Sequence, residues 1–118
     1  MYGNAMEKDT SIFKYFREGD IVLDYEGSCW KNRKFRIARL FGQRYNPMCL
    51  AYFAGCEESW QTHSNLSVNN IILVGSGRRP MARIATPLLV KLIKAGNIEA
   101  KREFIIRSNV KKYKHRLS

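Results

Sequence analysis

The sequence predicts an α+β protein in which an N-terminal five-stranded small β-barrel is followed by a C-terminal basic helical segment. Two observations predict this fold. Five short apolar segments, each bounded by turn residues, follow one another between residues 18 and 77, and this spacing is typical of a small barrel or a strongly bent antiparallel sheet. From residue 78 onward, the apolar residues recur with the period of a helix.

We expect strands at residues 21–25, 34–41, 48–54, 60–63 and 71–74, with the Asn- and Ser-rich residues 64–70 as a turn. In the second of these strands, strict alternation places Arg39 on the same side as Phe35 and Ile37. The charged head of Arg39 must then reach the rim of the barrel or pair with an acid such as Asp20 or Asp24.

Two helices are predicted after the barrel. Thr86-Pro87 has the form of an N-cap followed by proline at the first helical position, and Gly96-Asn97 is a typical helix end. A second helix is expected from residue 98 to about 109. Residues 110–118 carry too little apolar surface to pack, so we expect this tail to be frayed or ordered only by a partner.

These boundaries divide the chain into three parts. Residues 1–17 are expected to form a short N-terminal helix or docking segment, residues 18–77 the barrel, and residues 78–118 the basic helical region and tail.

The opening Gly19-Asp20-Ile21-Val22-Leu23, followed by a turn and an Arg-punctuated strand that ends at Gly42, resembles the start of SH3-like small barrels. That group includes the KOW modules of transcription and ribosomal proteins. The resemblance covers about residues 18–75, and residues 28–34 carry no Lys-Gly pair of the kind that KOW modules have there. It implies the barrel fold and no single function, because small barrels bind nucleic acids, peptides and lipids alike.

Charge is sorted along the chain. Residues 31–54 contain six basic residues and no acid, and residues 78–118 contain twelve basic residues against only Glu99 and Glu103, within a total net charge of +11. Two such blocks repel themselves in a folded protein, and a polyanion is the usual ligand, since Lys and Arg release counterions when they neutralise phosphates. A generally basic, well-solvated surface is the alternative.

Three segments concentrate the candidate site. Residues 30–45 combine cations with Trp30 and Tyr45, which suits phosphate contact and base stacking, unless Trp30 belongs to the core. Residues 75–80 either cradle a phosphate or form a flexible basic hinge, and residues 111–116 read as an electrostatic arm. The expected nucleic-acid-binding residues are Trp30, Lys31, Arg33, Lys34, Arg36, Arg44, Tyr45, Arg78, Arg79, Lys101, Arg102, Lys111, Lys112, Lys114 and Arg116.

We expect no metal, no cofactor and no catalytic residue. Cys49, Cys56 and His63 recur every seven residues, with Cys29 as a fourth candidate, but zinc ligands usually pair two to four residues apart. A nuclease would need carboxylates for metal, and only Glu57 and Glu58 accompany the basic barrel segment.

The longest apolar runs are too short to span a bilayer, and the first 20 residues are charged throughout. An odd number of cysteines favours reduced thiols. We therefore expect a cytoplasmic protein without a membrane partner.

The leading hypothesis is a small regulatory protein that binds DNA, RNA or a ribonucleoprotein mainly through phosphate contacts. Compact basic chains of this kind are common among accessory proteins of phages. The alternative is an interaction module that docks on an acidic protein surface of a host macromolecular machine or defence enzyme, with apolar anchors in residues 88–93 and 104–106. A third hypothesis is a nuclease-like enzyme using Glu57, Glu58 and His63.

Overall fold

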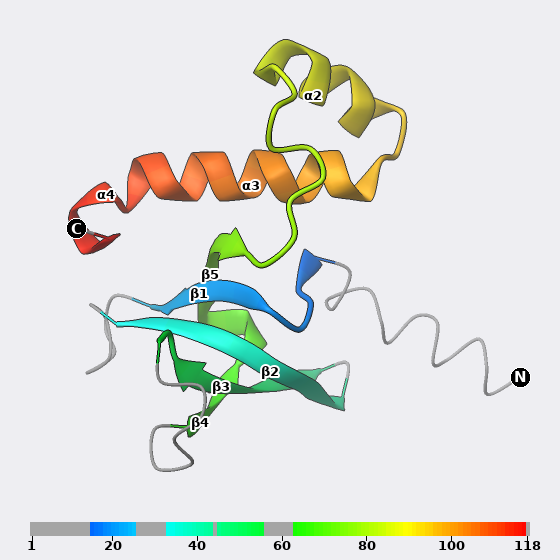
Figure 1. The fold of residues 1–118 in the computed structure, drawn as a ribbon. Coiled ribbons are helices and arrows are strands. Elements are labelled where there is room, and N and C mark those ends of the chain that lie inside the picture. Colours follow the sequence, from blue (N-terminus) through cyan, green and yellow to red (C-terminus); the bar gives the residue numbers. More distant parts are fainter. Residues whose placement is uncertain (1–14, 26–32, 44, 56–62, 118) are drawn as a thin grey trace, which may run out of the picture.

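The computed structural model describes residues 15–25, 33–43, 45–55 and 63–117. It is a mixed α+β structure with one five-stranded antiparallel sheet and helices that follow it in the chain (Figure 1). The elements are β1 (Asp20–Asp24), β2 (Lys34–Gln43), β3 (Asn46–Phe53), β4 (His63–Ser67), the 3-10 turn η3 (Val68–Asn70), β5 (Ile71–Ser76), α2 (Thr86–Lys94), α3 (Ile98–Lys112) and α4 (Lys114–Leu117).

The strands lie in the order β4-β3-β2-β1-β5, so the last strand returns to pair with the first. This order leaves β4 and β5 at the two edges of an open sheet. In the part of the chain that the structure describes, the predicted closure into a barrel is therefore not found.

The fourth strand differs most from the sequence prediction. It covers His63–Ser67, so the predicted turn at residues 64–70 is wrong for residues 64–67, whereas residues 68–70 form the 3-10 turn η3. Leu66 and Val68 are both buried in the core, and their burial outweighs the turn preference of the Asn and Ser residues around them.

A bulge in β2 corrects the prediction for Arg39. Ile37 is paired with Ala51 and Arg39 with Leu50, so Ala38 is an extra residue in β2. A bulge shifts the alternation of the following side chains by one position. Arg39 is consequently exposed, with its Cζ 5.2 Å from the centre of the Phe41 ring. The expectation that Arg39 lies on the core side of β2 is therefore wrong.

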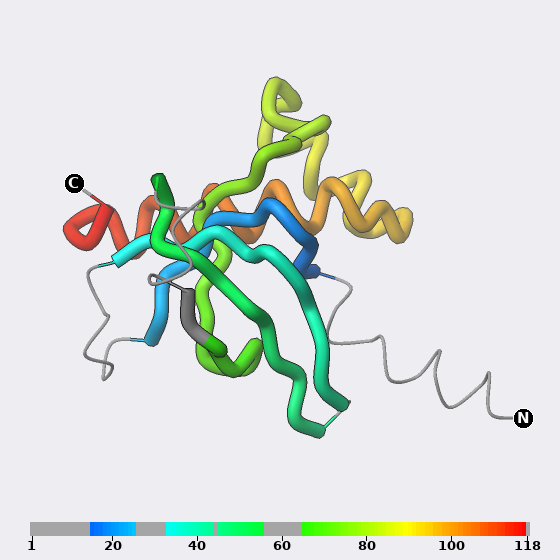
Figure 2. Tube along the Cα trace, turned by 60° about the horizontal axis from the view of Figure 1, so that its bottom comes forward, coloured from blue at the N-terminus to red at the C-terminus, as the bar shows by residue number. Residues whose placement is uncertain are grey.

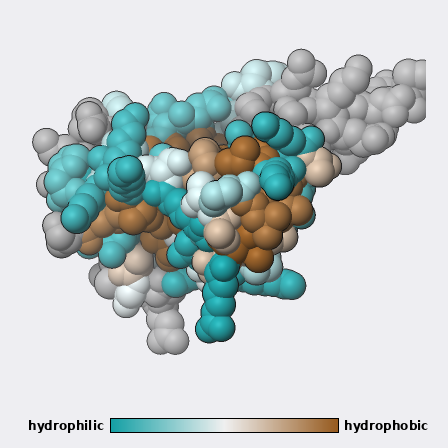
Figure 3. Space-filling view, turned by 90° about the horizontal axis from the view of Figure 1, so that it is seen from above, coloured by the Kyte–Doolittle hydropathy of each residue, from teal (hydrophilic) through white to brown (hydrophobic). Residues whose placement is uncertain are grey.

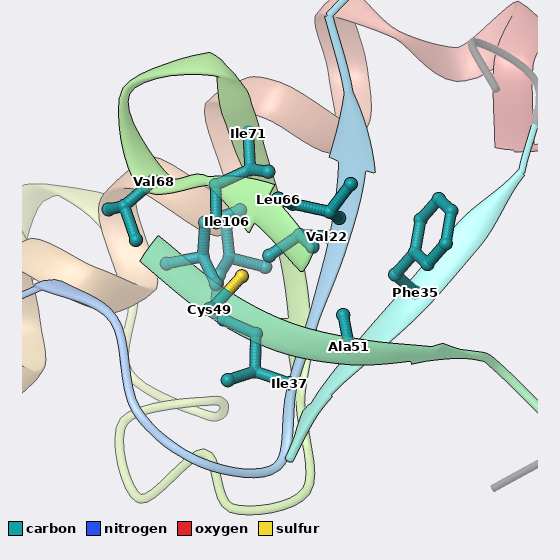
Figure 4. Packing of buried hydrophobic residues seen from close by; sticks show 10 residues of the cluster. Val22, Phe35, Ile37, Cys49, Ala51, Leu66, Val68, Ile71 and Ile106 are labelled. Atoms are coloured by element: carbon teal, nitrogen blue, oxygen red, sulfur yellow. The ribbon is translucent and has the colours of Figure 1, made fainter. Parts of the chain in front are cut away.

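The core joins the sheet to α3. Residues from all five strands and from η3 meet Ile106 of α3 in one cluster (Figure 4), including Val22, Phe35 and Cys49. The views in Figures 1 and 2 both show α3 running across the sheet, with β5 beside it and α2 on the far side of α3. The helical region therefore shares its core with the strands.

The predicted helices α2 and α3 are confirmed, with small shifts. The N-cap of α2 is Ala85, one residue before the predicted Thr86, and Pro87 lies in the first turn. Gly96 adopts a φ of 88°, which lets the chain turn from α2 into α3 at little cost. The side chain of Asn97 caps α3 by accepting a hydrogen bond of 3.0 Å from the Ala100 N–H.

The C-terminal tail is ordered by contacts within the chain, so the expectation of a frayed tail is wrong. Helix α3 continues to Lys112 and α4 follows directly. Arg116 is only 5% exposed, and its Nη2 donates a hydrogen bond of 2.6 Å to the backbone oxygen of Asp24 at the end of β1. Among the described residues, no helix is long and apolar enough to cross a membrane.

Candidate nucleic-acid interface

The two acidic residues of α3 are turned toward arginines. Glu103 is buried and accepts hydrogen bonds from Arg79 at 3.0 and 2.6 Å and from Arg107 at 2.9 Å. Burial alone raises the pKa of Glu103, but the hydrogen bonds from Arg79 and Arg107 together outweigh it and hold the pKa below its usual range. Glu99 pairs with Arg17 and lies 3.6 Å from Arg102. Both acidic charges of α3 are thus compensated within the protein.

A buried ion pair fixes α3 to the sheet. The guanidinium of Arg102, 3% exposed, donates to both carboxylate oxygens of Asp20 at 2.8 Å and to the Tyr15 carbonyl at 2.9 Å. The hydroxyl of Ser76 donates to Asp20 at 2.8 Å. The hydrogen bonds to Asp20 raise the pKa of Arg102 against the effect of burial. Arg102 therefore holds the fold together, and its predicted role in nucleic-acid binding is corrected.

The outward face of α3 is basic. At about 100° per residue, Lys101, Ser108 and Lys112 fall on one line along the helix, and Lys111 lies roughly a quarter turn away from it. The buried residues Glu103 and Ile106 lie on the opposite side. Since both acids of α3 point away from this line, they do not compensate the positive charge of the lysines there.

Basic residues of the tail and of the start of β2 lie at the same end of the molecule. The contact between Arg116 and Asp24 brings α4 to the end of β1 where β2 begins, and Figures 1 and 2 both show α4 and the start of β2 at the same end of the molecule. We call this end of the molecule the basic end. Its exposed cations are Arg33, Lys34, Lys111, Lys112 and Lys114.

Aromatic rings lie against cations at the basic end. The Cζ of Arg33 is 3.9 Å from the centre of the Phe53 ring. The Tyr113 ring has Lys112 Nζ at 5.3 Å and Arg116 Cζ at 5.6 Å. Cations held over rings suit contact with a phosphate beside a base or sugar. Tyr113 lies within the predicted basic run, but the sequence prediction did not include it among the binding residues.

A second group of predicted residues lies around Gly19 and Gly77, apart from the basic end. Arg36 Nη1 donates to the Gly19 carbonyl at 3.0 Å, and the Gly77 N–H donates to the same carbonyl at 3.1 Å. Arg79 pairs with Glu103, and both Arg78 and Arg79 are exposed. Residues 75–80 are thus tied to neighbouring elements by hydrogen bonds from Gly77 and Arg79.

The remaining predicted residues do not join the basic end. Tyr45 is 81% exposed at the β2–β3 hairpin, a full strand of about 30 Å away from Lys34. Arg116 is buried and positions α4, so its predicted direct role is corrected. Trp30, Lys31 and Arg44 lie outside the described residues.

Most of the candidate metal-binding and nuclease residues lie outside the residues that the structure describes. Cys29, Cys56, Glu57, Glu58 and the side chain of His63 fall there. Cys49 is buried in the core, and burial raises its pKa to about 11, which opposes the thiolate that zinc requires. Among the residues that are described, no three His, Cys, Asp or Glu side chains form a group that could hold a metal ion.

Comparison of the chain with protein-family models, with curated proteins and with solved structures found no match.

Proposed function

We propose that the protein is a small nucleic-acid-binding regulator, without catalytic activity, that holds the phosphate backbone at the basic end. The observation that supports this best is the meeting of cations from β2 and from the C-terminal helices, while the acids of α3 are neutralised internally. Each exposed Lys or Arg that replaces a counterion on a phosphate adds affinity that depends on salt.

The proposed roles differ among the residues. Lys111, Lys112 and Lys114 act as point charges, and Lys101 extends the contact along α3. Arg33 combines its charge with the ring of Phe53. Arg116 acts indirectly, because its hydrogen bond to the Asp24 carbonyl keeps α4 at the end of the sheet. In this proposal Arg78 is a separate, secondary contact.

We also propose that the sheet is an SH3-like small barrel and that the protein is cytoplasmic, as the sequence predicts. The strand order, with β5 beside β1, supports it. So do the irregularities in register of the β1–β5 and β2–β3 pairs, since bulges bend strands toward closure.

A salt titration tests the proposed function. Affinity for duplex DNA, single-stranded DNA and structured RNA is measured side by side by fluorescence anisotropy. If five cations each neutralise a phosphate, the slope of log affinity against log salt should be about −4.5 for duplex and about −3.5 for single strands. A slope near zero, or no binding at low salt, contradicts the proposal.

A protein-docking module remains the second proposal. Figure 3 shows hydrophobic surface on the side of the molecule that carries α2, where Leu88 is 47% exposed. The predicted anchors at residues 104–106 fit less well, because Ile106 belongs to the core. Pull-down of one acidic protein after nuclease treatment, with no affinity for nucleic acid, would favour this alternative.

A further inference from the structure

An apolar cavity lies next to the basic end, between α3 and the edge strand β5. Its volume is about 310 Å³, and the residues that line it include the aromatic residues Tyr15, Phe16 and Tyr113, with Ile72, Ile105 and Asn109. Small-molecule sites of roughly 300–1,000 Å³ with mainly apolar walls and a few fixed polar groups are typical of proteins. The cavity is at the lower end of that range, which suits one planar ring system.

One polar group of the cavity wall is held in place. Asn109 Nδ2 donates a hydrogen bond of 2.9 Å to the backbone oxygen of Leu73 in β5. This bond fixes the amide on the wall beside the aromatic rings. A fixed amide among apolar side chains can orient a ligand that carries both a ring face and a polar edge.

Tyr113 belongs to both the cavity and the basic end. Tyr113 is one of the residues that line the cavity, and its ring centre lies 5.3 Å from Lys112 Nζ and 5.6 Å from Arg116 Cζ. A ligand that fills the cavity would therefore have a cation at its margin. This complementarity favours a ligand whose flat, apolar part is joined directly to an anionic part.

We propose that the cavity accepts an unstacked base of a single-stranded nucleic acid, while the adjoining phosphates lie on the basic end. This inference rests on the proposed function and names its substrate class. Bases of a single strand are free to leave the stack and to pack on aromatic side chains, whereas those of a duplex are paired inside it. Duplex DNA should consequently bind through its phosphates alone.

Three labelled ligands test the inference on the full chain. They are an oligothymidylate and an oligouridylate of about ten nucleotides, which separate DNA from RNA, and an abasic strand of equal length and charge. We expect the base-bearing strands to bind roughly tenfold more tightly than the abasic strand, since stacking of a base on an aromatic ring contributes on this scale.

Two variants locate the contact. Tyr113→Leu removes the ring from the cavity and should bring the affinity for oligothymidylate close to that of the abasic strand. Tyr45→Leu is the matched control, because it removes an exposed tyrosine at the distant hairpin, and it should leave the difference unchanged. Circular dichroism checks that both variants are folded.

The outcomes separate the two proposals. Equal binding of base-bearing and abasic strands overturns the base-binding inference while the proposed function stands. An unchanged preference in folded Tyr113→Leu also overturns it. If duplex DNA binds but no single strand does, only the inference fails. If neither duplex DNA nor any strand binds even at low salt, the proposed function fails and the inference fails with it.

Discussion

Replacing Arg102 by methionine is expected to lower the free energy of unfolding by about 3–5 kcal/mol. The guanidinium of Arg102 donates to both oxygens of a fully buried Asp20 and to the Tyr15 carbonyl. Methionine fills a similar volume but donates no hydrogen bond. The variant therefore leaves a buried carboxylate whose charge has lost its bidentate partner, and this penalty dominates the effect.

A second variant separates this charge penalty from lost packing. In Asp20→Asn combined with Arg102→Met, the buried charge is removed as well, so at least about 1 kcal/mol of stability should return. Urea unfolding followed by circular dichroism measures both variants. The reasoning is refuted if the single variant loses less than about 1 kcal/mol, or if the double variant is no more stable than the single one.

Three further predictions concern the tail, Glu103 and Cys49. Arg116→Met should lower the free energy of unfolding by about 1–3 kcal/mol, because the Asp24 carbonyl loses the hydrogen bond from Arg116. An unchanged melting temperature would contradict the proposal that this contact orders the tail. The pKa of Glu103 is lower in the folded state, so the contribution of Glu103 to stability is present above the unfolded pKa of about 4.3 and is lost as the pH falls through the folded pKa. Glu103→Gln should therefore flatten the acid side of the curve of unfolding free energy against pH. An equally steep decline in the variant would argue against this role of Glu103. With Cys29 and Cys56 changed to serine, Cys49, whose pKa is raised to about 11, should react with iodoacetamide only after unfolding, whereas rapid labelling of the native protein would exclude the buried thiol.

The local signals in the sequence predicted the regular elements well. Thr86-Pro87 and Gly96-Asn97 bracket α2 within one residue, because caps and turns depend on neighbouring residues alone. The extension of the fourth strand to Ser67 was missed because only the burial of Leu66 distinguishes residues 64–67 from a polar turn. That burial depends on residues far away in the chain.

The candidate site could be predicted only in part, for the same reason. The exposed lysines of residues 111–114 follow from composition. Composition does not show that Arg102 and Arg116, unlike these lysines, are buried, since their partners Asp20 and Asp24 lie more than eighty positions away in the chain. Likewise, the bulge at Ala38 that exposes Arg39 arises from the register between β2 and β3.

The central claim is that the basic end, and not the overall positive charge, holds the nucleic acid. Comparing Lys111→Ala/Lys112→Ala with Lys91→Ala/Lys94→Ala tests it most directly, because each variant removes two exposed lysines, and the second pair lies on α2. The first variant should bind single-stranded DNA about 1–3 kcal/mol more weakly and reduce the salt slope by about 1.4, and the second should bind like the parent. Equal losses in the two variants would contradict the claim.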